Sequence, residues 1–204
     1  MKTAILGGSF NPVHIGHLIL AEEVLSQCGY DRILFIPANI PPHKSIDDPG
    51  PHIRLEMLEA ATKEFPEFAV SNCEILRKGV SYTIDTVRYL KTDDVLKGQI
   101  DGKPGLIVGD DLLAGFFEWK EPYLLVSEVD IIVAHRQYPY RLSLPYPHRY
   151  VENTIIPISS SEVRARISSV KAWHSLVPQP VQAIIEQKGL YGFSASRSSN
   201  SAVS

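Results

Sequence analysis

Two histidines lie three residues apart where the first apolar run of the chain ends, in GGSFNPVHIGHLIL at residues 7–20. Gly7 and Gly8 carry no Cβ, so a bulky ligand can approach the backbone closely at this point. Backbone amides of such a turn, next to a helix N-terminus, form an anion site. His14 and His17 can point to one side of the helix start and donate N–H groups to a bound phosphate. The residue types and their spacing therefore indicate a phosphate-binding turn.

Other chemistries for this turn have less support. A zinc site would need two further ligands, and no third histidine or cysteine lies close in the sequence. The chain has no G-x-x-x-x-G-K-[ST] loop, no G-x-G-x-x-G turn after the first strand and no G-x-S-x-G elbow. The sequence thus predicts a phosphate site without the usual devices of P-loop kinases, dehydrogenases or serine hydrolases.

The elements that must position this turn alternate along the chain. Strands are predicted at Thr3–Leu6, Ile33–Ile36, Phe68–Ser71, Leu106–Val108, Val129–Ala134 and Ile155–Ile158, and helices at Leu18–Gln27, His52–Lys63, Thr83–Leu90, Ser161–Ile167 and Pro180–Gln187. Several strands are apolar throughout, which is typical of a parallel sheet with helices on both faces. We therefore expect an α/β protein with a Rossmann-like, doubly wound parallel sheet. Ligands of such sheets bind beyond the carboxyl ends of the strands, which here carry GGSFNP, PANIPPHK, GDD and ISSS.

The composition is that of an ordinary globular protein. With 204 residues, we expect one domain over 1–193 and a disordered tail over 194–204, which is small, polar and unperiodic. A net charge of −3 and a pI of about 6.2 argue against a nucleic-acid partner. No stretch approaches the roughly 20 apolar residues of a membrane span, and Cys28 and Cys73 predict two free buried thiols. We expect a soluble, cytoplasmic protein whose partners are small molecules, and the sequence leaves homo-oligomerisation open.

Two segments together resemble the signatures of the nucleotidyltransferase superfamily. GGSFNPVHIGHL is similar to its G-x-F-[DN]-P-x-H-x-G-H segment, and residues 158–164, ISSSEVR, resemble its ISS-x-x-x-R segment. The HIGH tetrapeptide also occurs in class I aminoacyl-tRNA synthetases, but these use a KMSKS loop that is absent here. Read alone, ISSSEVR is also a serine-capped exposed helix start, since S-x-x-E is a capping box, and both readings can hold at once.

Within the superfamily the chain most resembles the bacterial nicotinate mononucleotide adenylyltransferases, from Lys2 to Tyr191. The phosphopantetheine adenylyltransferases are a more distant likeness, since they carry threonine where this chain has His14 and lack the PPHK loop. The segments that carry the closer resemblance are PANIPPHK at 37–44, RLEML at 54–58, Ser81-Tyr82-Thr83, a G-x-D…F-x-x-W pattern over Gly109-Asp110 and Phe117–Trp119, and Gly189-Leu190-Tyr191.

The resemblance implies transfer of AMP from ATP to nicotinate mononucleotide, which gives nicotinate adenine dinucleotide and pyrophosphate in NAD biosynthesis. The acceptor phosphate is itself the nucleophile, so catalysis would rest on positioning and on charge neutralisation. ATP implies Mg²⁺ carried by its phosphates, with no dedicated protein ligands. The alternatives are the same chemistry with nicotinamide mononucleotide or phosphopantetheine as acceptor, and a nucleotide-sensing module without catalysis.

By the same resemblance, three groups of residues form the site. The first, catalytic group comprises His14, His17 and Arg164. The second, for ATP, comprises Gly7, Gly8, Ser9, Phe10, Asp110, Ile158, Ser159 and Ser160. The third, for the acceptor, comprises Asn39, His43, Lys44, Ser81, Tyr82, Thr83, Trp119 and Arg136. The chain departs from the family at RQYPY, where R-P-G is common, so the pose of Arg136 and the role of 137–150 stay open. Trp173 belongs to no motif and is expected to pack in the core.

Overall fold

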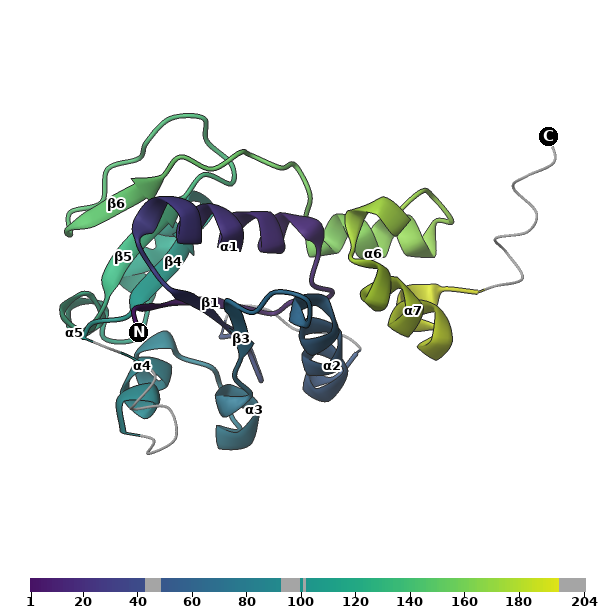
Figure 1. Ribbon diagram of the computed structural model, residues 1–204, viewed down its shortest axis with the longest axis horizontal. Helices are drawn as coiled ribbons and strands as arrows, with labels where there is room; N and C mark the ends of the chain where they lie inside the picture. Colours follow the sequence, from purple (N-terminus) through teal and green to yellow (C-terminus); the bar gives the residue numbers. More distant parts are fainter. Residues whose placement is uncertain (43–48, 93–99, 101, 195–204) are drawn as a thin grey trace.

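A six-stranded parallel β-sheet forms the centre of the computed structural model, which describes residues 1–42, 49–92, 100 and 102–194 (Figure 1). Its strands are β1 Thr3–Gly8, β2 Arg32–Pro37, β3 Phe68–Val70, β4 Gly105–Gly109, β5 Asp130–Ala134 and β6 His148–Val151. The order in the sheet is β3-β2-β1-β4-β5-β6, and every pairing is parallel. The expected doubly wound α/β sheet is confirmed. Its topological switch point lies between β1 and β4, where such sheets bind ligands.

Helices cover both faces of this sheet. They are α1 Ile15–Cys28, α2 Pro51–Thr62, α3 Cys73–Arg77, α4 Thr83–Thr92, α5 Pro122–Glu128, α6 Ser160–Ser168 and α7 Gln179–Lys188, with 3-10 segments η2 Asp110–Glu118, η3 His174–Leu176 and η4 Leu190–Gly192. Figure 1 shows α1 on one face of the sheet and α3, α4 and α5 on the other. The C-terminal helices α6 and α7 lie beyond the end of the sheet, where α7 contacts α2. The start of α6 is thereby brought next to the turn that precedes α1.

Side chains of each strand alternate between two buried cores. In β2, Ile33 and Phe35 join the core formed with α1, α2, α6 and α7, whereas Leu34 and Ile36 join the core formed with α4, η2 and α5. This alternation explains why the strands are apolar throughout, since both of their faces are covered.

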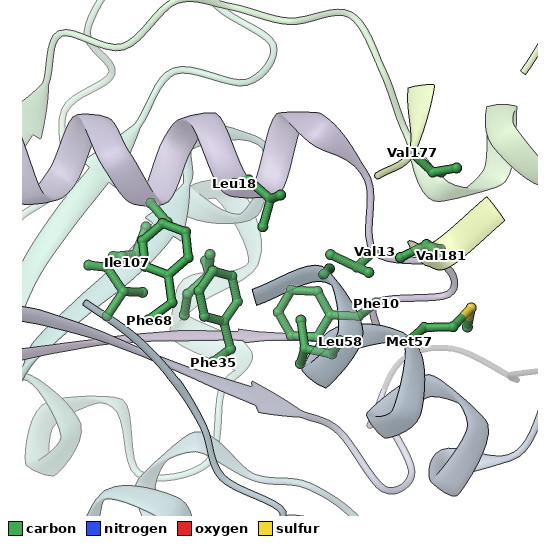
Figure 2. Packing of buried hydrophobic residues seen from close by; sticks show 14 of the residues in the cluster. Phe10, Val13, Leu18, Phe35, Met57, Leu58, Phe68, Ile107, Val177 and Val181 are labelled. Atoms are coloured by element: carbon green, nitrogen blue, oxygen red, sulfur yellow. The ribbon is translucent and has the colours of Figure 1, made fainter. Parts of the chain in front are cut away.

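The turn that follows β1 is anchored in the first core by its apolar residues. Phe10 is 1% exposed, and its ring centroid lies 5.9 Å from that of Phe35. Figure 2 shows Phe10 and Val13 packed near Leu58 and Val181, which come from α2 and α7. Full burial of such side chains contributes about 1.5–3 kcal/mol each. The polar residues between them are therefore held in place by the core.

Most predicted elements are found within three residues of their expected ends, and one is wrong. Residues 155–158 form no strand, because Pro157 offers no N–H and His148–Val151 already pairs with the free edge of β5. The sequence reading missed that strand inside the tyrosine- and proline-rich stretch. It also missed the short helices α3 and α5 and the 3-10 segment η2.

Two smaller expectations, for the cysteines and for Trp173, are confirmed. Cys28 and Cys73 are free and buried, and Trp173 is 4% exposed within the first core. Gly29 and Gly189 end α1 and α7 in the left-handed conformation, with φ of 65° and 60°. Within the described part of the chain, no helix is both long and apolar enough to cross a bilayer.

Candidate active site

A cavity of about 450 Å³, here called the histidine cavity, opens at the carboxyl ends of β1 and β4. Residues of the GGSFNPVHIGHL segment line it together with residues of the distant ISSSEVR segment. The predicted members among its lining residues are Gly7, Gly8, Ser9, Phe10, His14, His17, Arg136, Ile158, Ser159, Ser160 and Arg164. The fold thus brings both sequence signatures to one hollow at the topological switch point.

The two imidazoles stand against each other at the start of α1. His14 precedes the helix and His17 lies in its first turn, with ring centroids 3.7 Å apart. The backbone N–H of His14 donates to Nδ1 of His17 at 3.1 Å. An Nδ1 atom that accepts a hydrogen bond leaves the proton of a neutral imidazole on Nε2. His17 therefore holds its Nε2–H as a donor for another partner.

Both histidines are kept neutral by their surroundings. Burial, helped by the nearby charge of Arg136, lowers the pKa of His14 from 6.5 to about 3. Burial also lowers the pKa of His17 well below its usual range, with His14 and Arg136 adding to the effect. Both ring nitrogens of His14 are buried without a hydrogen-bond partner among the described residues. A buried polar atom without a hydrogen-bond partner destabilises the folded protein. The two nitrogen atoms of His14 therefore favour a ligand with oxygen atoms that could bond to them.

The position of Gly16 in HIGH leaves little room for a larger side chain. A Cβ on Gly16 would lie 3.1 Å from Nδ1 of His14 and 3.2 Å from its Cε1, which is tighter than ordinary contact. A Cβ on Gly8 would likewise press on the ring of Phe10 at 3.2 Å, whereas one on Gly7 would meet nothing within 4 Å. Gly16 and Gly8 therefore make room for neighbouring rings, and Gly7 leaves open space in the cavity.

The ISSSEVR segment holds the turn from the opposite side. Nη1 of Arg164 donates to the carbonyl oxygen of Asn11 at 2.7 Å, and the Ser160 hydroxyl donates to that of Pro12 at 2.8 Å. Ser159 caps α6 by accepting from the N–H of Glu162 at 3.1 Å, so the capping-box reading is confirmed for this bond. The same segment therefore caps a helix and lines the histidine cavity.

Two adjacent aspartates after β4 have different surroundings. Asp110 is 1% exposed, and its carboxylate accepts the backbone N–H groups of Arg136, Gln137 and Tyr138 at 2.9–3.1 Å. This geometry does not favour its sequence-based role as a direct ATP ligand, because its oxygens hold the loop after β5. Asp111 is the carboxylate on the cavity wall, 3.5 Å from Nη1 of Arg136. The G-x-D spacing counted from Gly109 falls on Asp111, a signal that the sequence reading passed over.

Arg136 places a positive charge at the histidine cavity, and hydrogen bonds to Asp110 hold the backbone of residues 136–138. Its guanidinium lines the histidine cavity and lowers the pKa of both histidines. A Cβ on Gly109 would lie 2.5 Å from Cδ of Arg136, so glycine there permits the arginine's close approach. The pose that the sequence left open is therefore against the histidine cavity, despite the unusual RQYPY segment.

A second cavity of about 270 Å³, here called the tryptophan cavity, lies on the other side of the turn. Its wall includes Ser81, Tyr82, Thr83 and Trp119, as the sequence predicted, and it is largely apolar. The N-terminus of α4 begins at Thr83 on this wall, and the ring of Trp119 packs on Phe116 with centroids 5.0 Å apart. The lining residues common to both cavities are Gly7, Gly8, Ser9, Ile107 and Leu112.

A buried carboxyl that the sequence reading missed lies in the wall of the tryptophan cavity. Glu74 is 8% exposed and accepts from the Thr86 hydroxyl at 2.5 Å, while that hydroxyl accepts from Arg77 at 3.0 Å. Burial raises the pKa of Glu74, opposed by hydrogen bonds from Thr86 and Ser81. The carboxyl group thus braces both ends of the Ser81–Thr86 segment, and no sequence motif marked it.

Three predicted acceptor residues are not among the described residues of this wall. Asn39 lies behind it, where its Nδ2 donates to the carbonyl oxygen of Gly79 at 2.9 Å and its N–H donates to Ser81 Oγ at 2.9 Å. His43 and Lys44 lie outside the described residues. The structure otherwise gathers the predicted acceptor group around the two cavities.

A cavity lined by arginines and histidines beside a largely apolar one, at the switch point of a parallel sheet, is typical of a nucleotide-binding protein of the doubly wound α/β class. Comparisons with known proteins are more specific. The sequence model of the cytidylyltransferase-like family matches residues 5–166. A Borrelia garinii protein named "Probable nicotinate-nucleotide adenylyltransferase" is 41% identical over 94% of this chain and 95% of its own length. A Treponema pallidum protein of the same name is 36% identical over 94% of this chain and 99% of its own length.

A solved structure supports the same fold. The Plasmodium falciparum nicotinic acid mononucleotide adenylyltransferase complexed with NaAD superposes with a TM-score of 0.74 at 20% identity, over 95% of this chain and 99% of that one. The chain therefore belongs to the cytidylyltransferase-like family, in its group of nicotinate-nucleotide adenylyltransferases.

Proposed function

We propose that this protein transfers AMP from ATP to nicotinate mononucleotide and releases pyrophosphate. One observation carries the proposal: a cavity lined by Arg136, Arg164 and the two histidines and a largely apolar cavity lined by Trp119 share the wall formed by Gly7, Gly8 and Ser9. Two ligands bound there would meet over residues that have little or no side chain. The names of the curated relatives agree with this assignment.

The triphosphate of ATP is assigned to the histidine cavity. Nε2–H of His17 and the guanidinium groups of Arg136 and Arg164 are the donors that would hold it. A neutral imidazole can donate its single N–H to phosphate without first gaining a proton, while the arginines supply the positive charge. Asp111 lies on the same wall and is the carboxylate available for a ribose hydroxyl.

The pyridine ring of the acceptor is assigned to the tryptophan cavity. Trp119 offers an aromatic face, and the start of α4 at Thr83 offers a positive helix end for the ring carboxylate. A phosphate oxygen of the mononucleotide then attacks the α-phosphorus. The bond from that phosphorus to the oxygen bridging the β-phosphate breaks, and pyrophosphate leaves with its negative charge facing His17 and Arg164. Catalysis requires positioning and charge stabilisation and no protein nucleophile.

The remaining assignments follow from the substrate. Mg²⁺ would accompany ATP, held by phosphate oxygens and water in the way this ion is usually bound, where it would neutralise phosphate charge. Residues 1–193 would act as one catalytic domain. Free buried thiols at Cys28 and Cys73 fit a reducing, cytoplasmic setting.

The test of this function is pyrophosphate release from Mg-ATP with each of three acceptors offered separately. The expected result is release with nicotinate mononucleotide at a higher kcat/KM than with nicotinamide mononucleotide, and none with phosphopantetheine. Release with phosphopantetheine alone would overturn the assignment, and equal rates with the two mononucleotides would refute the acid selectivity. Tight ATP binding without release for any acceptor would favour a nucleotide-sensing module instead.

A further inference from the structure

The largest fully buried side chain of the described residues is an arginine outside the two signature segments. Arg54 lies in the first turns of α2 and is 1% exposed. Its place in the RLEML segment is the only reason for which the sequence analysis names it. A buried guanidinium requires an explanation, because its charge is costly to remove from water.

The guanidinium binds backbone oxygens of two different segments. Its Nη1 donates to the carbonyl oxygen of Ser9 at 2.6 Å. Its Nη2 donates to that of Ala38 at 2.6 Å and to that of Asn39 at 3.1 Å. Ser9 belongs to the turn after β1 that both cavities share, and the other two residues follow β2. Arg54 therefore joins the two chain segments just beyond their paired strands.

This joint, formed by Arg54 with Ser9, Ala38 and Asn39, lies where β1 and β2 stop pairing. The pairing of β1 with β2 ends at Gly8 and Pro37, and the N–H of Ala38 makes one further bond to the Gly8 carbonyl at 2.9 Å. Beyond that bond the two segments diverge to form the site. A planar fork with several donors can bind oxygens on both segments at once, which a single ammonium group cannot do in the same geometry.

The joint continues into the tryptophan cavity. Asn39, which accepts from Arg54, donates its own N–H to Ser81 Oγ at 2.9 Å, and the N–H of Ser81 donates to the Ile40 carbonyl at 2.8 Å. Contacts therefore run without a break from Ser9, through Arg54 and Asn39, to the segment that carries Tyr82 and Thr83.

Arg54 has no ion-pair partner in the part of the chain that the structure describes, and its Nε atom is buried there without a hydrogen-bond partner. Burial lowers its pKa, with Tyr191 and Glu74 opposing the effect. Its described hydrogen bonds therefore all go to the two backbone segments. Hydrogen bonds to the backbone of two segments are expected of a side chain that fixes the distance between those segments, and not of one member of an ion pair.

We propose that Arg54 is a positioning residue that sets the separation between the ATP turn and the acceptor segment. The proposal rests on the proposed function, since the distance it fixes is that between the α-phosphorus and the attacking phosphate oxygen. Small errors in such a distance lower the rate of the chemical step far more than they weaken the binding of either reactant. Arg54 itself touches neither reacting atom.

The test compares Arg54→Lys and Arg54→Met with Arg88→Met, which removes an exposed arginine paired with Glu121. For Arg54→Lys we expect kcat to fall at least about tenfold, and for Arg54→Met at least about a hundredfold. Dissociation constants for a non-hydrolysable ATP analogue and for nicotinate mononucleotide, measured separately by calorimetry, should stay within about threefold at full stoichiometry. Wild-type kcat in Arg54→Lys would overturn the proposal. The proposal would also be overturned if kcat fell only in proportion to the fraction of protein that still binds the two ligands.

Hydrogen exchange separates failure of this inference from failure of the proposed function. Peptides covering residues 7–11 and 36–41 should exchange faster in Arg54→Lys than in the wild type and in Arg88→Met, whichever acceptor the enzyme uses. Unchanged exchange in both peptides would refute the joint, even if the wild-type protein makes the expected dinucleotide. An inactive wild-type protein with the expected exchange difference would refute the proposed function and leave the joint standing.

Discussion

The histidine cavity and the tryptophan cavity share one turn but are lined by different kinds of side chain. The lining of the first includes two arginines, three histidines and one carboxylate, whereas the second is lined mainly by apolar and aromatic side chains and holds the buried carboxyl of Glu74. Positive charge is concentrated where a polyanion would bind. Apolar surface is concentrated where a flat ring would bind. The shared glycines allow the two ligands to approach each other. The difference between the cavities determines which reactant would bind in which cavity.

The largest expected effect is at His17. His17→Ala should lower turnover by about a hundredfold or more, because it removes an Nε2–H donor from charge that develops on the leaving pyrophosphate. The matched control is His52→Ala, since His52 is exposed on α2 away from both cavities. Steady-state kinetics and thermal unfolding of both variants provide the measurement. Near-normal turnover in a folded His17→Ala protein would remove His17 from the mechanism.

The second effect concerns the neutrality of His14. Because its pKa is lowered from 6.5 to about 3, the unfolded chain binds a proton there that the folded chain does not. The ligand-free protein should therefore lose stability as pH falls below about 6.5, by about 2 kcal/mol from this group at about pH 5. Burial of Glu74 raises its pKa and acts in the opposite direction, so His14→Gln must be compared with the wild type at each pH.

Denaturant unfolding at several pH values measures this contribution. The free energy of unfolding should fall less steeply with acid in His14→Gln than in the wild type. Parallel curves for the two proteins would show that His14 is not held neutral in the folded state.

The smallest effect is expected at the glycine of HIGH. Gly16→Ala should favour the helix slightly but displace the ring of His14, because its Cβ would lie 3.1 Å from Nδ1. We expect kcat to fall by about fivefold, less than a full loss of a donor. Gly115→Ala is the control, since a Cβ there meets nothing within 4 Å. Equal kinetics for the two variants would mean that the ring pose is unimportant.

The two cavities also differ in how far the sequence could predict them. The histidine cavity rests on two compact motifs, so His14, His17 and Arg164 could be assigned before the fold was known, and the fold brings them together. The tryptophan cavity is assembled from short pieces of several elements. A buried carboxyl such as Glu74 has no pattern of its own, because only packing reveals its burial.

The fold shows the same division. Strands that are apolar throughout, and most of the longer helices, were predictable from their residue pattern. The strand at His148–Val151 was not, since it is short, carries polar residues and follows a segment rich in proline. The neighbouring aspartates Asp110 and Asp111 are an example of the same limit. The G-x-D spacing was visible in the sequence, but only the hydrogen bonds from the backbone N–H groups of residues 136–138 show that Asp110 turns away from the cavity.

The most direct test of the two-cavity assignment is a pair of binding measurements on two variants. Calorimetry would give the dissociation constants of a non-hydrolysable ATP analogue and of nicotinate mononucleotide for the wild type, Arg164→Met and Trp119→Ala. Arg164→Met should weaken the ATP analogue by about tenfold and leave the mononucleotide within about twofold, and Trp119→Ala should do the reverse. If both variants weaken both ligands equally, or if the two effects are exchanged, the assignment of ATP to the histidine cavity and of the acceptor ring to the tryptophan cavity is wrong.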